Sequence, residues 1–401
     1  MTPLLQRATF AALCLTLLVL PWTTAGFSIG LGLAGLCSLL AWRRGTLNLE
    51  HPFLLPSLVW VGALLISYIW SHADRAGDEA RTYYPFLLTF VASAAVKSGE
   101  QARQMALVLL GTATVSAAIA CCHQLGWIDA GTTRYSGTVT IFTFAMVMAT
   151  AYIIAALTFA AAERRWVKAL AFVIGIITLG GIVANGSRAI LIAVAAAYLT
   201  ILALLHRRRV PLLLFLLPMV AAAPLVLETK MGKRLLYVKS ELRLDGSPPS
   251  NREAMWVAAN KMFYDHPYMG VGVGSFVEDR DRLYAQGRME GYPELGEGYK
   301  TAHNILLHLA ATMGTVGLVA FAIWFGGYIV YFLRHRARDR LLAAGALALL
   351  ALVLGFGVTD MSLLNSRITG LLAIGLGACL GGIRAQEQEA QAAEAAATEA
   401  A

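Results

Sequence analysis

The sequence predicts an all-α polytopic membrane protein with about 12 transmembrane helices and one large, mainly helical extracytoplasmic loop between the ninth and tenth of them. Composition gives the first reason. Of the 401 residues, 58% are hydrophobic and only 14% are charged, whereas soluble domains carry about 25% charged residues. The second reason is a series of long apolar runs. The third is the uneven distribution of basic residues between the gaps that separate these runs.

Each expected span is an apolar run approaching the roughly 20 residues that an α-helix needs to cross the hydrocarbon core. The first run resembles a signal peptide, with Arg7 near its start. No small-residue cleavage site follows cleanly, so we expect a retained first helix. The fourth run is short and is expected to tilt or to be partly re-entrant. The spans are expected at 4–20, 26–42, 53–70, 84–96, 104–122, 138–161, 166–184, 188–205, 210–227, 310–333, 341–358 and 368–384.

Basic residues predict the orientation. Twelve spans place both termini on one side, whose gaps hold sixteen Lys and Arg residues, whereas the short gaps on the other side hold five. Because cytoplasmic loops carry the excess of basic residues, we expect a multi-pass protein of the cell inner membrane with both termini in the cytoplasm. The sixteen are Arg7, Arg43, Arg44, Lys97, Arg103, Arg164, Arg165, Lys168, Arg207, Arg208, Arg209, Arg334, Arg336, Arg338, Arg340 and Arg384, and the five are Arg75, Arg81, Arg134, Arg188 and Arg367.

The hydrophilic segment 228–302 interrupts the pattern, with eleven Lys and Arg and eleven Asp and Glu residues. The alternation of the spans places it in the periplasm. It holds a turn cluster from Asp245 to Ser250, an expected helix from Asn251 to Tyr264 and a glycine-rich stretch. Such a length is unusual for a simple connector, and its aromatic residues predict an ordered cap. The expected division is helices 1–9 (1–227), the periplasmic loop (228–302), helices 10–12 (303–384) and a cytoplasmic tail (385–401) that is helical or disordered.

Composition also disfavours several function classes. The net charge of +8 is dispersed among short gaps rather than gathered in a stripe, so no nucleic-acid partner is expected. The cysteines lie inside apolar runs without a C-x-x-C pair, so we expect small buried residues rather than disulfides or a zinc site. They are Cys14, Cys37, Cys121, Cys122 and Cys379.

Two motifs in the loop resemble nucleotide-dependent sites only superficially. The glycines of Gly270-Val271-Gly272-Val273-Gly274 follow His266-Pro267 and lack the third-glycine spacing of a dinucleotide loop. We therefore expect a tight turn where backbones pack closely. Asp279-Arg280-Asp281 is interpreted as a solvated charged turn because the flanking arginines offer local ion pairs. Neither nucleotide binding nor a metal is expected.

The candidates for chemistry lie at the outer ends of spans. Ser187 is a plausible N-cap for the eighth span, which would place Arg188 in its first turn. An arginine is unfavourable at the positive end of a helix dipole, and an anionic ligand would remove that conflict. The alternative is an arginine that reaches the lipid headgroups.

The loop contributes two further candidates. Arg252 opens the expected loop helix, where the neighbouring Glu253 offers a purely structural partner. Thr301 is a possible cap for the tenth span, which would place His303 in the first turn, at the outer boundary, where a histidine can act as a general base. The alternative is an interfacial histidine bonded to a loop carbonyl. His303 and His308 do not share a helix face, so no metal site is expected there.

Four motifs together resemble the O-antigen ligase family, within the wider group of O-antigen ligases, O-antigen polymerases and related membrane glycosyltransferases. The resemblance covers about residues 180–330. One departure is Thr312-Met313-Gly314, where the family pattern has an acidic residue before the glycine. The motifs are Gly186-Ser187-Arg188, Asn251-Arg252 with Trp256, His266-Pro267-Tyr268-Met269-Gly270-Val271-Gly272-Val273-Gly274-Ser275-Phe276, and His303-Asn304.

The resemblance implies a GT-C-like, inverting and metal-independent glycosyltransferase of lipopolysaccharide biosynthesis that needs no cofactor. The donor would be an O-polysaccharide on undecaprenyl diphosphate and the acceptor lipid A–core on the periplasmic face, with membrane lipids around them and no nucleotide or nucleic acid. Arg188 and Arg252 would bind the diphosphate, and His303 would deprotonate the acceptor hydroxyl.

Supporting roles are expected for several residues nearby. Asp360 is expected either to orient His303 or Arg188, or to pair with Arg367. Asn304 belongs to the motif of His303. Basic residues of the loop would line the path of a phosphorylated core, namely Lys300, Arg280, Arg282 and Arg288.

Three rival functions stay open at this point. An O-antigen polymerase shares donor and architecture but takes another lipid-linked glycan as acceptor, and a protein oligosaccharyltransferase takes a polypeptide. The single large loop between the ninth and tenth spans favours a ligase. A lipid-linked glycan transporter would instead show ionisable residues deep in the bundle and broken helices at matching positions in two halves.

Overall fold

The structure is a computed structural model that describes residues 3–43, 51–128, 135–228, 249–296 and 298–400. Within these ranges every regular element is helical. The long helices are α1 (Pro3–Val19), α2 (Thr24–Arg43), α3 (Leu54–Trp70), α6 (Gly99–Gln124), α7 (Ile141–Ala161), α8 (Arg165–Asn185), α9 (Arg188–Leu204), α10 (Arg209–Glu228), α15 (Ile305–Arg334), α16 (Arg340–Gly357) and α17 (Ser366–Ala400). The shorter ones are α4 (Ala76–Ala80), η1 (Arg81–Leu87), α5 (Leu88–Ala95), η2 (His206–Arg208), α13 (Asn251–Asp265), α14 (Phe276–Ala285) and η3 (Ser362–Leu364).

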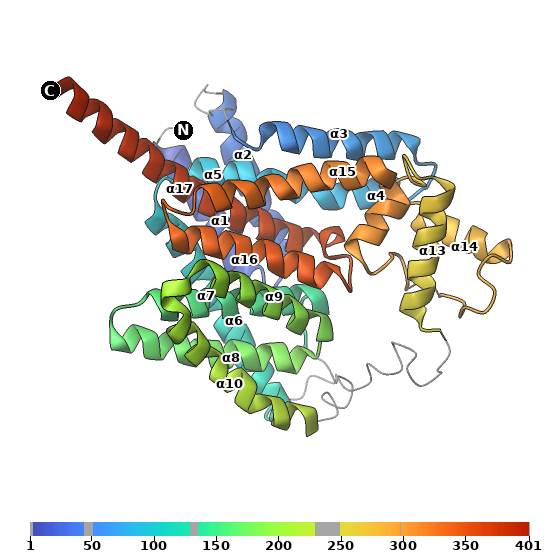
Figure 1. Cartoon of the computed structure of the whole chain (residues 1–401), viewed down its shortest axis with the longest axis horizontal. Coiled ribbons are helices and arrows are strands. Elements are labelled where there is room, and N and C mark those ends of the chain that lie inside the picture. Colours follow the sequence, from blue (N-terminus) through green and yellow to red (C-terminus); the bar gives the residue numbers. More distant parts are fainter. Residues whose placement is uncertain (1–2, 44–50, 129–134, 229–248, 297, 401) are drawn as a thin grey trace.

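Most of the long helices lie side by side along the length of the molecule, whereas α10 runs obliquely, and α13 and α14 lie across one end of this bundle (Figure 1). Both termini lie toward the opposite end, where α17 extends beyond its neighbours. The tail expected at 385–401 is thus a continuation of the last helix through Ala400. The expected loop helix is confirmed as α13, one residue longer than predicted.

Seven of the described helices are long and apolar enough to cross a membrane. A further pair, Arg188–Leu204 and His206–Leu217, passes this test together but bends by 104°, and α1 and α3 are shorter apolar helices. The chain is therefore a multi-pass membrane protein, while the count of about twelve spans stays a prediction. The short fourth run consists of η1, which contains Pro85, followed by the eight residues of α5.

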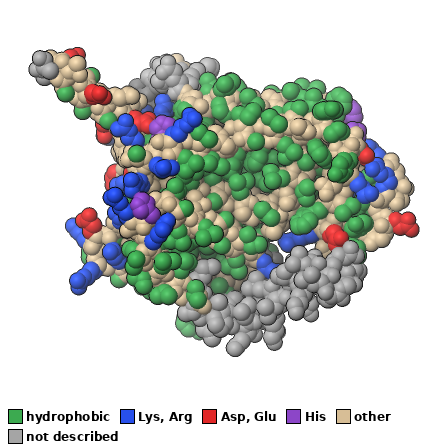
Figure 2. Space-filling view, in the orientation of Figure 1, with side chains coloured by type: hydrophobic (Ala, Val, Ile, Leu, Met, Phe, Trp, Pro, Cys, Tyr) green, Lys and Arg blue, Asp and Glu red, His purple; other side chains and the backbone are tan. Residues whose placement is uncertain are grey.

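The surface agrees with a membrane environment. Hydrophobic side chains cover the flank of the bundle, and Lys and Arg side chains gather near the end from which the C-terminal helix leaves (Figure 2). This gathering agrees with the uneven distribution of Lys and Arg between the gaps of the sequence. The five cysteines are free, and each is partly rather than fully buried. The prediction that they are buried was therefore wrong in its extent.

Helix α15 is broken at Gly314, whose φ of 60° is outside the helical region. The glycine-rich loop fills the break. The N–H groups of Val271 and Gly272 donate to the carbonyls of Ala311 and Thr312, at 2.8 and 2.9 Å. A Cβ on Gly314 would lie 2.4 Å from the carbonyl oxygen of Tyr268. The loop motif therefore makes close backbone packing, as predicted.

Candidate functional site

Arg188 is the first residue of α9 and directly follows the N-cap Ser187. Gly186 ends α8 in the left-handed conformation, with φ of 66°, which turns the chain sharply into α9. The buried amide of Asn185 holds this turn, because its Nδ2 donates to the carbonyls of Tyr135 and Ile141 at 3.1 and 3.0 Å. The expected position of Arg188 in a first helical turn is confirmed. Arginine side chains and the N–H groups of helix starts are both suited to binding phosphate oxygens.

Arg252 is the second residue of α13. Ser250 caps this helix by accepting a hydrogen bond from the Glu253 N–H at 3.2 Å. Among the described residues, no carboxylate lies within ion-pairing distance of Arg252. Its guanidinium is half-buried at the start of a helix, as that of Arg188 is. Two helix starts thus each carry an arginine.

Asn304, rather than Thr301, caps the tenth expected span. The Asn304 Oδ1 accepts hydrogen bonds from the Leu306 and Leu307 N–H groups, both at 3.0 Å, and α15 begins at Ile305. The expectation that Thr301 caps the helix and places His303 in its first turn was therefore wrong. The amide of Asn304 is the better cap because it bonds two helix N–H groups and also donates to the Val358 carbonyl, at 2.9 Å.

His303 lies just before the helix with φ of 46°, an unusual value for a residue other than glycine. Its Nδ1 is 3.6 Å from Oδ1 of Asp360. That distance is too long for a hydrogen bond but short enough for strong attraction once the ring is protonated. Asp360 is buried, and its Oδ1 also accepts the Met361 N–H at 2.7 Å. The bond from Asn304 to Val358 holds the two chain segments together.

Tyr299 connects the loop helix to His303. Its ring lies edge-on to the imidazole, with 6.4 Å between centroids, and its hydroxyl accepts a hydrogen bond from the Asn251 side chain at 2.6 Å. The Arg280 guanidinium donates to the Tyr299 carbonyl at 2.5 Å. Since Arg252 follows Asn251 in the chain, the first turn of α13 lies close to the His303 segment.

Arg188 lies at this same end of the bundle. The start of α7 contacts both relevant segments: Asn185 donates to Ile141, and Asn365 bonds with Thr143, at 3.0 Å. Arg188 follows Asn185 by three residues, and Asp360 precedes Asn365 by five. The structure therefore brings the His303–Asp360 pair to the same end of the bundle as Arg188 and Arg252, although they come from distant parts of the sequence.

The sequence reasoning missed a pair formed by His308 and Glu79 next to this segment. His308 is completely buried, its Nε2 lies 3.1 Å from Oε1 of Glu79, and its Nδ1 accepts the Ala302 N–H at 3.4 Å. A neutral imidazole has one donor and one acceptor, so accepting at Nδ1 assigns the proton to Nε2, which donates to the Glu79 carboxylate. His308 thus anchors the residue directly before His303. The available sequence signal was an ionisable side chain inside an apolar helix.

The other expected supporting residues are distributed unevenly. Lys300 is exposed next to Tyr299. Arg288 instead forms a bidentate pair with Asp265, at 2.6 and 3.0 Å, at the far end of α13 from Arg252. The expected pairing of Asp360 with Arg367 is not among the ion pairs of the described residues.

The Asp279-Arg280-Asp281 motif lies in helix α14 and not in a turn, and Arg280 is buried. The predicted local ion pairs are confirmed, because Arg280 pairs with Asp281 at 2.6 Å and Arg282 with Asp279 at 2.5 Å. Arg280 also donates to the Tyr299 carbonyl, so it helps to hold the segment that precedes His303. In the described part of the chain, no three His, Cys, Asp or Glu side chains converge on a point where they could hold a metal ion.

Residues 170–322 match a family model described as O-antigen ligase. The match confirms the family that the four motifs predict, and it includes Arg188, Arg252 and His303. The matched segment is thus similar to the superfamily of O-antigen ligases and polymerases, which are glycosyltransferase-like membrane enzymes. No curated protein matches the chain.

Proposed function

We propose that this protein is an O-antigen ligase, which transfers polysaccharide from undecaprenyl diphosphate to a sugar hydroxyl of lipid A–core on the periplasmic face of the inner membrane. The observation that carries the proposal is the juxtaposition of His303 and Asp360 at the end of the bundle that α13 covers. This end is opposite the one where basic residues gather. With that gathering in the cytoplasm, both termini are cytoplasmic and the site faces the periplasm.

His303 is the proposed general base. Its Nδ1 faces Asp360, which leaves Nε2 to take the proton from the acceptor hydroxyl as that oxygen attacks the anomeric carbon of the donor. The buried carboxylate stabilises the imidazolium that forms and orients the ring. The new glycosidic C–O bond forms on the face opposite the leaving group, so a single displacement inverts the anomeric centre. The proton then returns to solvent.

Arg188 and Arg252 are the proposed diphosphate ligands. When the bond between the anomeric carbon and the phosphate oxygen breaks, undecaprenyl diphosphate leaves with additional negative charge. Guanidinium groups stabilise this charge because they bind phosphate oxygens in a bidentate manner. Each arginine also adds the N–H groups of its own helix start. A donor that already carries diphosphate thus needs neither a nucleotide nor a further cofactor for this step.

His308 and Glu79 are proposed as positioning residues. A positive φ at a residue other than glycine costs about 1–3 kcal/mol, so the conformation of His303 needs support from its surroundings. The hydrogen bond from the Ala302 N–H to His308 fixes the preceding peptide, and Glu79 fixes the tautomer of His308. The loss of either contact would allow the His303 segment to relax away from Asp360.

Deletion in the parent cell, followed by gel analysis of its lipopolysaccharide, tests the reaction. Loss of all capped bands while lipid-linked polymer accumulates supports the ligase. Bands with a single repeat unit would instead identify an O-antigen polymerase, and unchanged lipopolysaccharide with loss of a glycoprotein would identify an oligosaccharyltransferase. Accumulation of lipid-linked glycan on the cytoplasmic side would identify a transporter. Complementation with the His303→Ala variant then tests the base within the same assay.

A further inference from the structure

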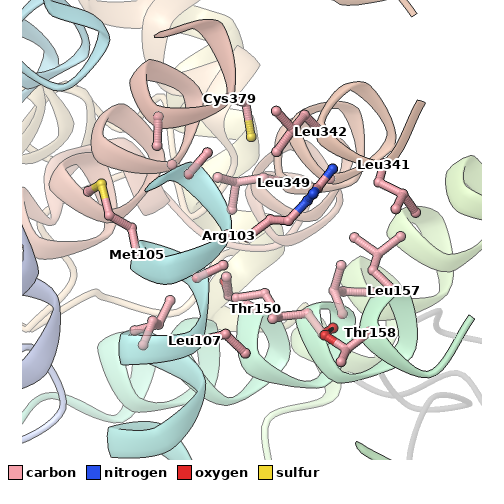
Figure 3. A pocket seen from close by; sticks show the side chains of 18 of the residues that line it. Arg103, Met105, Leu107, Thr150, Leu157, Thr158, Leu341, Leu342, Leu349 and Cys379 are labelled. Atoms are coloured by element: carbon pink, nitrogen blue, oxygen red, sulfur yellow. Dashed lines mark hydrogen bonds between the residues drawn. The ribbon is translucent and has the colours of Figure 1, made fainter. Parts of the chain in front are cut away.

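The bundle contains an apolar cleft at the end opposite the candidate site. It has a volume of about 450 Å³ and lies between α6, α7, α16 and α17 (Figure 3). Leu342 and Leu349 of α16 form part of its wall, together with Leu157 of α7 and Met105 of α6. This volume is within the usual range for ligand sites, about 300–1,000 Å³. Arg103 lines the cleft and is bonded to Asp339, which caps α16, so it marks the end of the cleft at the starts of α6 and α16, which we call the mouth.

The wall of the cleft offers a ligand almost no polar partners. Its two threonine hydroxyls are already bonded within α7, Thr150 to the Met146 carbonyl and Thr158 to the Ile154 carbonyl, both at 2.8 Å. Neither hydroxyl can donate to a ligand without losing that bond. A polar molecule would leave its own hydrogen-bonding groups unsatisfied in this space. The chemistry of the wall therefore selects a hydrocarbon chain.

The length of the cleft matches one leaflet of a bilayer. On α16 it extends from Leu341 to Leu352, which is about 17 Å of helix at 1.5 Å per residue. The hydrocarbon core of a bilayer is about 30 Å thick, so each leaflet contributes about 15 Å. An acyl chain that enters beside Arg103 would thus fill the cleft and end near the middle of the membrane.

Arg103 is the only Lys or Arg among the described residues that line the cleft. The Arg103 side chain is about half exposed, with 49% of its surface accessible, and pairs through Nη2 with Asp339 at 2.9 Å. A guanidinium has five N–H donors, so this pair leaves others for a phosphate. Arg164 and Arg165 are exposed near Val167, another lining residue. Basic sites between helices on the cytoplasmic side suit anionic phospholipids.

We propose that this cleft binds an anionic phospholipid of the leaflet opposite the candidate site, with one acyl chain between α6, α7, α16 and α17 and its phosphate on Arg103. The polyprenyl donor is a poorer occupant, because its diphosphate must reach the His303 end while the cationic mouth is at the other end. The bound lipid would fill a space that side chains leave open and would hold α6 against α16. This inference is independent of the reaction that the His303 site catalyses.

The test quantifies the lipid that stays with the purified protein. A leucine at position 345 would fill the cleft, since the Cβ of Gly345→Leu would meet only Leu157, at an ordinary 3.5 Å. Native mass spectrometry in mild detergent should find phospholipid on the unchanged protein and at least a tenfold loss in Gly345→Leu, about 1.4 kcal/mol. The matched control is Val173→Leu on the exposed face of α8, which should keep the lipid. Leu157→Trp serves as the second filling variant if Gly345→Leu does not fold.

Headgroup selectivity provides a second measurement. In nanodiscs with equal amounts of phosphatidylglycerol and phosphatidylcholine, the protein should retain phosphatidylglycerol preferentially. Arg103→Gln, which keeps a donor for Asp339 but removes the charge, should abolish that preference. The proposal is overturned if folded Gly345→Leu and Leu157→Trp retain as much phospholipid as the control. It is also overturned if the retained lipid is a polyprenyl phosphate, or if the unchanged protein retains none.

Discussion

Glu79 and His308 are 229 positions apart in the sequence and meet inside the protein, with 3.1 Å between Glu79 Oε1 and His308 Nε2. The other ring nitrogen of His308 accepts the N–H of Ala302, the residue before His303. A contact between α4 and α15 thus controls the backbone that carries the proposed base. The His308 side chain is fully buried and that of Glu79 is 11% exposed, so solvent screens their interaction less than it would screen a surface pair.

Substitution of His308 should lower activity through the position of His303. In His308→Phe, the Glu79 carboxylate and the Ala302 N–H both lose their partner, so kcat should fall while the KM for the donor stays close to its original value. His308→Gln can keep a donor for Glu79 and should recover part of kcat. Steady-state ligation kinetics measure both constants. A rise in the donor KM with unchanged kcat would show that the pair does not act through His303.

His303→Ala should lower ligation by about 10²–10⁴-fold, the range expected for loss of a general base. Asp360→Asn should cause a smaller loss, because the ring remains but loses the charge that stabilises its protonated form. Binding of undecaprenyl diphosphate to the purified variants should be unchanged, since neither residue is a proposed diphosphate ligand. Ligation by His303→Ala at the original rate would contradict the assignment.

Arg188→Lys and Arg252→Lys keep the charge but lose the planar fork that binds two phosphate oxygens. Charged hydrogen bonds contribute about 1.5–3 kcal/mol each, so each variant should lose at least about tenfold in affinity for undecaprenyl diphosphate. Arg81→Lys is the control, because Arg81 lies on the surface and pairs with Asp78, three residues earlier in the chain. Affinity equal to that of the control for both variants would exclude the two arginines as ligands.

Gly314→Ala should destabilise the junction between α15 and the glycine-rich loop. The new methyl group would lie 2.4 Å from the Tyr268 carbonyl oxygen at a φ of 60°, and the backbone strain alone costs about 1–3 kcal/mol. The Tm should therefore fall clearly in thermal unfolding. Gly326→Ala in the same helix has nothing within 4 Å of its new methyl group, so it should leave the Tm unchanged or raise it.

Acid should weaken the cap formed by α13 and α14. The hydrogen bond from Arg288 holds the pKa of Asp265 below its ordinary value of 3.8. A carboxyl group with a lowered folded-state pKa stabilises the fold above its unfolded pKa, and this stabilisation is lost as the pH falls through the folded value. Limited proteolysis should release the cap faster near pH 3 than at pH 7. In Arg288→Met, that pH dependence should be smaller.

Local chemistry made several parts of this protein predictable from the sequence. Apolar runs and the alternation of basic gaps indicated a multi-pass bundle, because both depend on the transfer of single residues between water and lipid. The capping preference of Ser187 placed Arg188 in the first turn of a helix, and helix propensity placed Arg252 in the first turn of α13. The count of about twelve spans and the roles of these arginines stay predictions.

Only the tertiary structure decided which side chains meet. His303 has Asp360 beside it because Asn304 bonds to the end of α16, and His308 is buried against Glu79 from a helix far earlier in the chain. Hydropathy could not predict that α15 is broken at Gly314, or that the glycine-rich loop packs into this break. Such contacts depend on how whole helices pack against one another. A single sequence, read residue by residue, does not show how close two side chains from different helices come.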